Sequence, residues 1–89
     1  MKKNFELEQN YPNPFNPTTM ITWQSLAGGR QTLKIFDIMG NEVATLVDEY
    51  KQAGVYEMEF DANKLTSGVY FYQLITGNFM ETKKFILLK

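Results

Sequence analysis

The side chains that carry most enzyme chemistry are absent from this chain or lie at turns. Its 89 residues include no histidine and no cysteine, so neither a nucleophile–base triad nor thiol chemistry can be assembled. The acidic residues Asp37, Asp48, Glu49 and Asp61 lie at turn signals and lack the spacing of an EF-hand calcium loop. We therefore expect no enzymatic activity, no cofactor and no metal site.

The last strand-like segment carries residue types that suit binding to another protein. Lys84 and Lys89 flank the apolar stretch Phe85–Leu88. The main-chain groups of a terminal strand can pair with a receptor strand by β-augmentation, and the two lysines can add charged contacts at the rim. The alternative is structural: Phe85 and Leu87 only complete the core.

Aromatic side chains offer a second binding chemistry. Tyr70 and Tyr72 alternate with Phe71, so one of these two sets faces the core. Tyrosines exposed on a flat sheet could stack on sugar rings. In that alternative the chain is a carbohydrate-binding or spacer module of a secreted glycoside hydrolase.

Length and charge narrow the class of protein. With 44% hydrophobic and 15% aromatic residues, the chain can form one small β-rich domain. We place this domain at 4–89, after an expression-derived start at 1–3. A net charge of −1 gives no electrostatic reason to expect nucleic acid or an anionic membrane. Even the longest apolar runs, such as Val69–Tyr72, are too short for membrane insertion, and we expect a monomer.

Alternation of apolar and polar residues dominates the chain and predicts half-buried strands. The expected strands cover residues 5–8, 21–24, 32–35, 42–47, 56–60, 69–76 and 79–88. Val43 and Leu46 are three positions apart rather than two, which indicates a bulge or, alternatively, one helical turn. The predicted fold class is all-β: an immunoglobulin-like antiparallel β-sandwich of about seven strands.

The expected core consists of apolar residues from these strands and from one loop. They are Ile21, Trp23, Leu33, Ile35, Val43, Leu46, Tyr56, Met58, Phe60, Leu65, Tyr70 and Tyr72.

Glycine and aspartate mark the turns. Asp37 can accept a hydrogen bond from the backbone two residues further on, and Gly40 can take a positive φ. Turns are expected at 27–30, 37–41 and 77–78, and polar loops at 48–54 and 61–68. The glycines expected to need backbone freedom are Gly40, Gly54 and Gly68.

All three prolines lie within residues 10–19, Asn-Tyr-Pro-Asn-Pro-Phe-Asn-Pro-Thr-Thr. Each proline lacks a backbone donor, and it biases the preceding residue toward extended geometry. We expect a stiff, extended strap that carries Tyr11 and Phe15 and protects an edge of the sandwich. Direct recognition of the strap by a receptor is the alternative.

Several motifs follow one another in a specific order: residues 10–19, Ile35–Gly40, Gly54, Phe60-Asp61, Leu65–Tyr70 and Lys84–Lys89. From Phe5 to Lys89 this order closely resembles the C-terminal sorting domain of the type IX secretion system, the type A or Por-secretion tail. The resemblance implies an immunoglobulin-like domain fused behind an N-terminal cargo. It also implies export through the periplasm and an outer-membrane translocon. A sortase-like surface protease then removes the tail, and the cargo is attached to the cell surface or released.

The resemblance also implies roles for individual residues. Translocon recognition is expected at Gly68, Tyr70, Lys84, Phe85, Ile86, Leu87, Leu88 and Lys89. Structural motif positions are Tyr11, Pro12, Asn13, Pro14, Phe15, Asp37, Gly40, Gly54 and Asp61.

Overall fold

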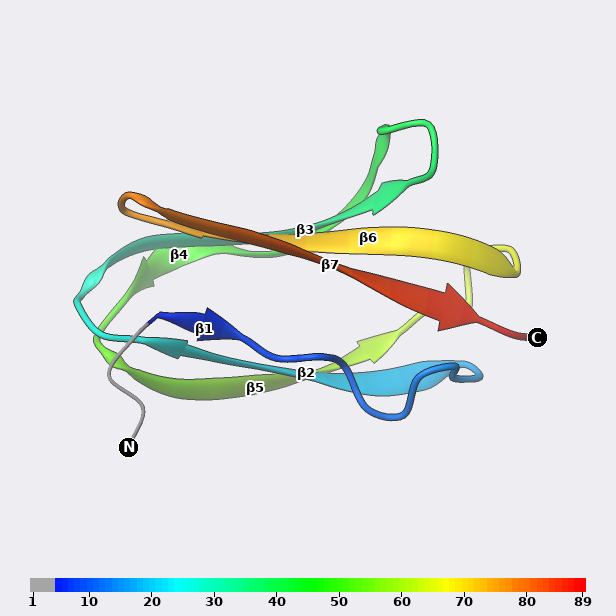
Figure 1. Ribbon diagram of the computed structural model, residues 1–89, viewed down its shortest axis with the longest axis horizontal. Coiled ribbons are helices and arrows are strands. Elements are labelled where there is room, and N and C mark those ends of the chain that lie inside the picture. The colour runs from blue at the N-terminus through cyan, green and yellow to red at the C-terminus, as the bar shows by residue number, and fades with distance from the viewer. Residues whose placement is uncertain (1–4) are drawn as a thin grey trace.

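The computed structural model describes residues 5–89, so the expected start at residues 1–3 lies outside the described residues. This range forms seven strands and no helix: β1 (Glu6–Leu7), β2 (Thr18–Ser25), β3 (Gly29–Asp37), β4 (Glu42–Lys51), β5 (Gly54–Asp61), β6 (Gly68–Thr76) and β7 (Phe79–Leu87). Two antiparallel sheets, ordered β1-β2-β5 and β4-β3-β6-β7, face each other (Figure 1). The predicted immunoglobulin-like sandwich is confirmed.

The register between strands follows from the alternation in the sequence. In the three-stranded sheet, Ile21 of β2 pairs with Met58 of β5, and Trp23 pairs with Tyr56. The Trp23 and Tyr56 rings stack with their centroids 5.7 Å apart. A slip of one residue would turn these side chains to solvent, so burial fixes the register.

β4 is longer than the sequence pattern predicts. It continues to Lys51, so the loop expected at 48–54 is wrong and only residues 52–53 separate β4 from β5. Residues 48–51 pair with 29–32 of β3, and Arg30 forms an exposed ion pair with Asp48 at 2.8 Å. β3 accordingly begins inside the turn expected at 27–30. β4 lies at the edge of its sheet, where solvent surrounds the strand, and this explains why residues 48–51 are mostly polar.

Two bulges interrupt β4, because its pairing with β3 skips Leu46 and Val43. The predicted bulge is confirmed and the alternative of a helical turn is wrong. The predicted burial of Val43 is also wrong, since this side chain is 38% exposed. Val47 is buried in its place, because an extra residue in a strand changes which side chains face the core.

The core lies between the two sheets. Its buried apolar residues are Leu7, Phe15, Ile21, Trp23, Leu33, Ile35, Val47, Phe60, Ala62, Tyr70, Tyr72, Leu74, Phe85 and Leu87. The other predicted core residues, Leu46, Tyr56, Met58 and Leu65, are half-buried against this cluster. Phe85 is its aromatic centre: the ring centroids of Phe15, Phe60, Tyr70 and Tyr72 lie between 5.0 and 6.0 Å from its own.

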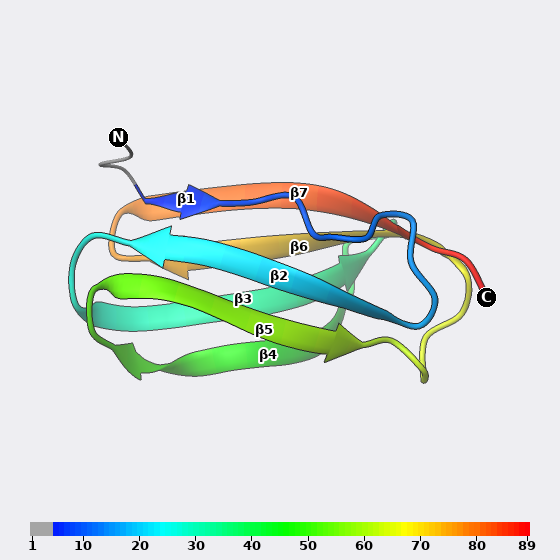
Figure 2. The same cartoon turned by 90° about the horizontal axis from the view of Figure 1, so that it is seen from below.

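The proline strap, residues 10–19, is bent rather than extended as predicted. The chain turns at residues 12–14 and 16–17, because it must pass from one sheet to the other within a few residues. Tyr11 bridges to Met20 of β2, whereas Phe15 bridges to Leu87 of β7. Figure 2 shows the strap beside the end of β7. The strap thus closes one side of the sandwich, as the edge-protecting interpretation expects.

A buried tyrosine anchors the beginning of the strap. The Tyr72 hydroxyl donates a hydrogen bond to the Glu8 carbonyl at 2.6 Å and accepts one from the Asn10 N–H at 2.8 Å. The buried Asn10 amide in turn donates to Thr19 Oγ1 at 3.0 Å. Burial, the largest cause, raises the pKa of Tyr72 to about 12.

We expect Tyr72→Phe to lower the free energy of unfolding by about 1–3 kcal/mol, because the buried Asn10 N–H loses its acceptor. The folded-state pKa of Tyr72, about 12, lies above the ordinary 10.0. The hydroxyl's stabilisation is therefore complete below pH 10.0 and is lost as the pH rises toward 12. Urea titrations should show that the free energy of unfolding falls less between about pH 8 and about pH 11 in Tyr72→Phe than in the wild type. Tyr50→Phe, at an exposed ring, is the control; an equal loss in all three proteins would contradict the assignment.

Three glycines have a positive φ: Gly40 at 87°, Gly68 at 154° and Gly77 at 58°. The predictions for Gly40 and Gly68 are confirmed, and Gly77 opens the predicted two-residue turn between β6 and β7. The prediction for Gly54 is wrong. Gly54 begins β5 without a positive φ, and a β-carbon there would make an ordinary 3.7 Å contact with the Tyr56 ring.

Gly68→Val should lower the free energy of unfolding by about 1–3 kcal/mol, because a β-branched residue rarely adopts the φ of this position. The strain is in the backbone, since no atom lies within 4 Å of a β-carbon built at this site. Gly29 has the same open space without a positive φ, so Gly29→Val is the matched control. Equal melting temperatures for the two variants would contradict the explanation.

Candidate functional site

Most of the motifs quoted from the sequence meet at one end of the sandwich (Figures 1 and 2). We call it the motif end. It comprises the β3–β4 tip at 37–41, the β5–β6 loop at 62–67, the strap and the end of β7. Gly54 begins β5 at the opposite end, directly after the connection between β4 and β5.

The β3–β4 tip is built on Asp37. Its Oδ1 accepts the N–H groups of Met39 and Asn41, both at 2.9 Å, which confirms the hydrogen bond predicted two residues further on. The bond from Asn41, followed by those from the rest of the turn, holds the pKa of Asp37 below its usual value. The turn satisfies its own polar groups but leaves Ile38 and Met39 exposed.

The β5–β6 loop is held by its neighbours and by its own turn. Asp61 Oδ1 accepts a backbone N–H two residues further on, at 2.9 Å. The Ala62 N–H donates to the Pro17 carbonyl of the strap at 2.8 Å. The Tyr70 hydroxyl donates to the Thr66 carbonyl at 2.7 Å. The strap and β6 therefore fix the position of this loop.

The outer edge of β7 is already occupied near its end. The Phe15 N–H donates to the Ile86 carbonyl at 3.1 Å, and the Leu88 N–H donates to the Phe15 carbonyl at 3.0 Å. The Ile86 N–H donates to the side-chain oxygen of Asn13 at 2.9 Å. A receptor strand would need these same main-chain groups to pair with β7 by β-augmentation. In the folded domain they are already bonded to the strap.

The residues after β7 join its edge to the β5–β6 loop. The Lys89 N–H donates to Ser67 Oγ at 2.9 Å, and its ammonium donates to the Asn63 carbonyl. The Leu88 side chain is 55% exposed. The main chain of this tail and the Lys89 ammonium therefore hold it in place, while the Leu88 side chain stays exposed.

The residues expected to be recognised by the translocon fall into two groups. The side chains of Tyr70, Phe85 and Leu87 are buried in the core. The second group is exposed or half-exposed and consists of Lys84, Ile86, Leu88, Lys89 and, at the start of β6, Gly68. A partner that meets the folded domain can contact the side chains of the second group, whereas those of Phe85 and Leu87 are out of its reach. Tyr70 and Tyr72 are both buried, so they offer no platform for stacking sugars.

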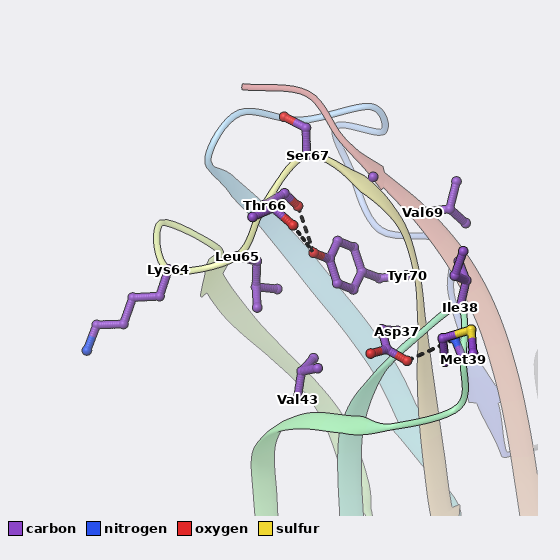
Figure 3. A pocket seen from close by; sticks show the side chains of 11 residues that line it. Asp37, Ile38, Met39, Val43, Lys64, Leu65, Thr66, Ser67, Val69 and Tyr70 are labelled. Atoms are coloured by element: carbon purple, nitrogen blue, oxygen red, sulfur yellow. Dashed lines mark hydrogen bonds between the residues drawn. The ribbon is translucent and has the colours of Figure 1, made fainter.

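A groove crosses the motif end (Figure 3). A cavity of about 450 Å³ separates the β3–β4 tip, with Ile38 and Met39, from the β5–β6 loop, with Lys64 and Leu65. A second cavity of about 380 Å³ continues between β4 and β5. Both are lined by Val43, Lys64 and Leu65. We call the two together the end groove.

No binding role is predicted from the sequence for Ile38, Met39 or Lys64. The sequence feature that could have indicated a binding surface at Ile38 and Met39 is that two consecutive apolar residues lie inside a predicted turn, where polar residues are usual. Nothing in the sequence around Lys64 marks it as part of a cavity.

Within residues 5–89, no group of three or more acidic, histidine or cysteine side chains is placed to hold a metal ion. No helix in this described range is long and apolar enough to cross a membrane.

Comparison with family models matches residues 9–88 to the secretion system C-terminal sorting domain. The chain belongs to this family. The match runs from the approach to the strap to Leu88, so it includes every element of the motif end. No curated protein and no solved structure matches the chain.

The chain is therefore a type IX C-terminal sorting domain, and the family is one of sorting signals rather than of catalytic domains. Membership implies a cargo fused on the N-terminal side and export to the cell surface or the extracellular space. β1, the strand nearest to that cargo in sequence, begins toward the end of the sandwich away from the motif end (Figure 1).

Proposed function

We propose that the translocon recognises this domain as a folded monomer, through the motif end, after the cargo has reached the periplasm. A sortase-like surface protease then removes the domain and attaches or releases the cargo. The observation that carries this proposal is the pairing of the strap with β7. Because Phe15 and Asn13 occupy the outer main-chain groups at 86–88, this segment is presented as side chains on a folded surface.

The position of the cargo supports the same proposal. The chain enters the sandwich toward one end and the motif end lies at the other (Figure 1). A bulky cargo on the N-terminal side therefore leaves the exposed side chains of Lys84, Leu88 and Lys89 accessible.

The test is a reporter fused in front of residues 5–89 and expressed in a bacterium with a type IX system. An isogenic strain without the translocon is the comparison. We expect the reporter at the cell surface or in the medium, without the sorting domain, only when the translocon is present. A reporter that reaches the surface equally in both strains would overturn the proposal.

A further inference from the structure

We propose that the outer edge of β5 binds an extended segment of a partner protein in which apolar and basic residues alternate. This contact lies along the side of the sandwich, outside the motif end, and does not depend on the proposed function. Figure 2 shows β7 and the strap on one side of the sandwich and β4 and β5 on the other. β4 and β5 are each the last strand of their sheet, with no further strand of residues 5–89 paired to them.

The main chain of β5 presents a row of hydrogen-bonding groups at this edge. On β2, the Met20 N–H and carbonyl bond to the strap at 2.9 and 3.0 Å, and the Thr22 carbonyl accepts the Glu8 N–H at 3.0 Å. Met20 is paired with Glu59 of β5, and Thr22 with Glu57. Facing residues of an antiparallel pair either bond to each other or both turn outward. The N–H and carbonyl groups of Glu57 and Glu59 therefore point away from β2, toward the outer edge.

The edges of the other strands are less suited to an added strand. At β7, main-chain groups of Ile86 and Leu88 are bonded to the strap. β4 is interrupted by two bulges, and β1 has two residues. β5 pairs with β2 over all of its eight residues without a bulge. A regular edge of this length is the kind of surface to which an extended peptide adds as a further strand.

The charges of the three-stranded sheet determine which segment fits. β1, β2 and β5 contain no lysine or arginine, whereas β5 carries the exposed carboxylates Glu57, Glu59 and Asp61. These side chains alternate with the ones that face the core, so they lie on the outer face of the sheet. Glu57 and Glu59 have no ion-pair partner among residues 5–89. A second copy of β5 would place like charges opposite each other, whereas a strand with outward lysines or arginines would place opposite charges there.

The inner side of the same edge favours apolar residues at the alternate positions. Tyr56 and Met58 on β5 and Leu46 on β4 are half-buried against the core. Inward side chains of an added strand would continue this apolar surface. Two lysines lie toward the ends of β5. The Lys51 ammonium is 4.8 Å from the centroid of the Tyr56 ring and pairs with an acid of β4, and Lys64 follows β5 in the β5–β6 loop.

The test is an NMR titration of the complete 89-residue chain with a synthetic peptide of alternating lysine and valine, eight residues long like β5. We expect binding that slows hydrogen exchange of the Glu57 and Glu59 N–H groups. Glu57→Gln with Glu59→Gln should weaken binding about tenfold. Glu42→Gln with Asp48→Asn removes the same charge from exposed residues of β4 and should leave the affinity unchanged.

A second peptide separates strand pairing from charge attraction. With the same sequence and every peptide nitrogen methylated, it keeps the charges but has no main-chain N–H to donate. We expect it to bind about tenfold more weakly.

Three results would overturn the inference, and none of them bears on delivery of the reporter fusion. Equal affinity of the two peptides would exclude strand pairing. Equal weakening by the two double substitutions would reduce the binding to net charge. No binding of the unmodified peptide at about 1 mM would show that the acids of β5 only protect its edge.

Discussion

Phe85→Ala is expected to unfold this domain at physiological temperature. Phe85 is fully buried, and four other aromatic rings have centroids within 6.0 Å of its own. Truncation of such a side chain costs about 3–5 kcal/mol, and a domain of this size has a total stability on the order of 5 kcal/mol. Circular dichroism during thermal unfolding should show no cooperative transition above about 37 °C.

Two controls separate the cavity effect from a general effect of substitution. Phe85→Leu retains most of the side-chain volume and should remain folded with a smaller loss of stability. Phe71→Ala, at a half-buried ring on the outer face of the neighbouring strand, should cost less than Phe85→Ala. A cooperative transition of Phe85→Ala at the wild-type temperature would contradict the central position of this ring.

The parts of the fold that could be predicted from sequence are those fixed by local patterns. The alternation in 56–60 determines which face of β5 is buried, because successive side chains in a strand point to opposite faces. The Asp37–Gly40 turn could be predicted because its hydrogen bonds close within five residues.

The errors come from pairing between distant segments. The bulges that expose Val43 exist only in the register with β3, and residues 48–51 become a strand only because β3 lies beside them. The bends in the strap depend on β7, which is more than 70 residues further along the chain. Local propensity carries no information on such partners.

The candidate site could be predicted only as a set of motifs. The sequence placed Lys84–Lys89 in one recognition group, but the structure buries Phe85 and Leu87 and leaves the side chains of Lys84 and Leu88 exposed. It gave no indication that Asn13 and Phe15 occupy the edge of the same strand. The end groove is formed by two loops and a bulge, so no contiguous sequence pattern could predict it.

Deletion of Leu88 and Lys89 should abolish surface delivery while leaving the domain folded. The deletion removes exposed side chains and three hydrogen bonds, one to Phe15 and two to the β5–β6 loop. Bonds of this kind near solvent contribute about 1 kcal/mol each or less. Phe85 and Leu87, which complete the core, are retained. The expected loss of stability is therefore small compared with that of Phe85→Ala.

A double substitution, Leu88→Ala with Lys89→Ala, separates side-chain recognition from the anchoring of the tail. It keeps the two main-chain N–H groups that bind Phe15 and Ser67. It removes the side chains that a partner would contact and, of the anchoring bonds, only that from the Lys89 ammonium to the Asn63 carbonyl. Met80→Ala with Lys83→Ala likewise truncates one apolar and one lysine side chain, in the first half of β7 and at its middle, and should be delivered normally.

The most direct test of recognition through the motif end is the surface-to-periplasm ratio of the reporter fusion with and without residues 88–89. Limited proteolysis of the purified domains establishes that both are folded. We predict surface delivery of the complete fusion, and periplasmic accumulation of both the truncated fusion and the Leu88→Ala, Lys89→Ala variant. Normal surface delivery of the folded, truncated fusion would show that the end of β7 is structural only and would contradict the account.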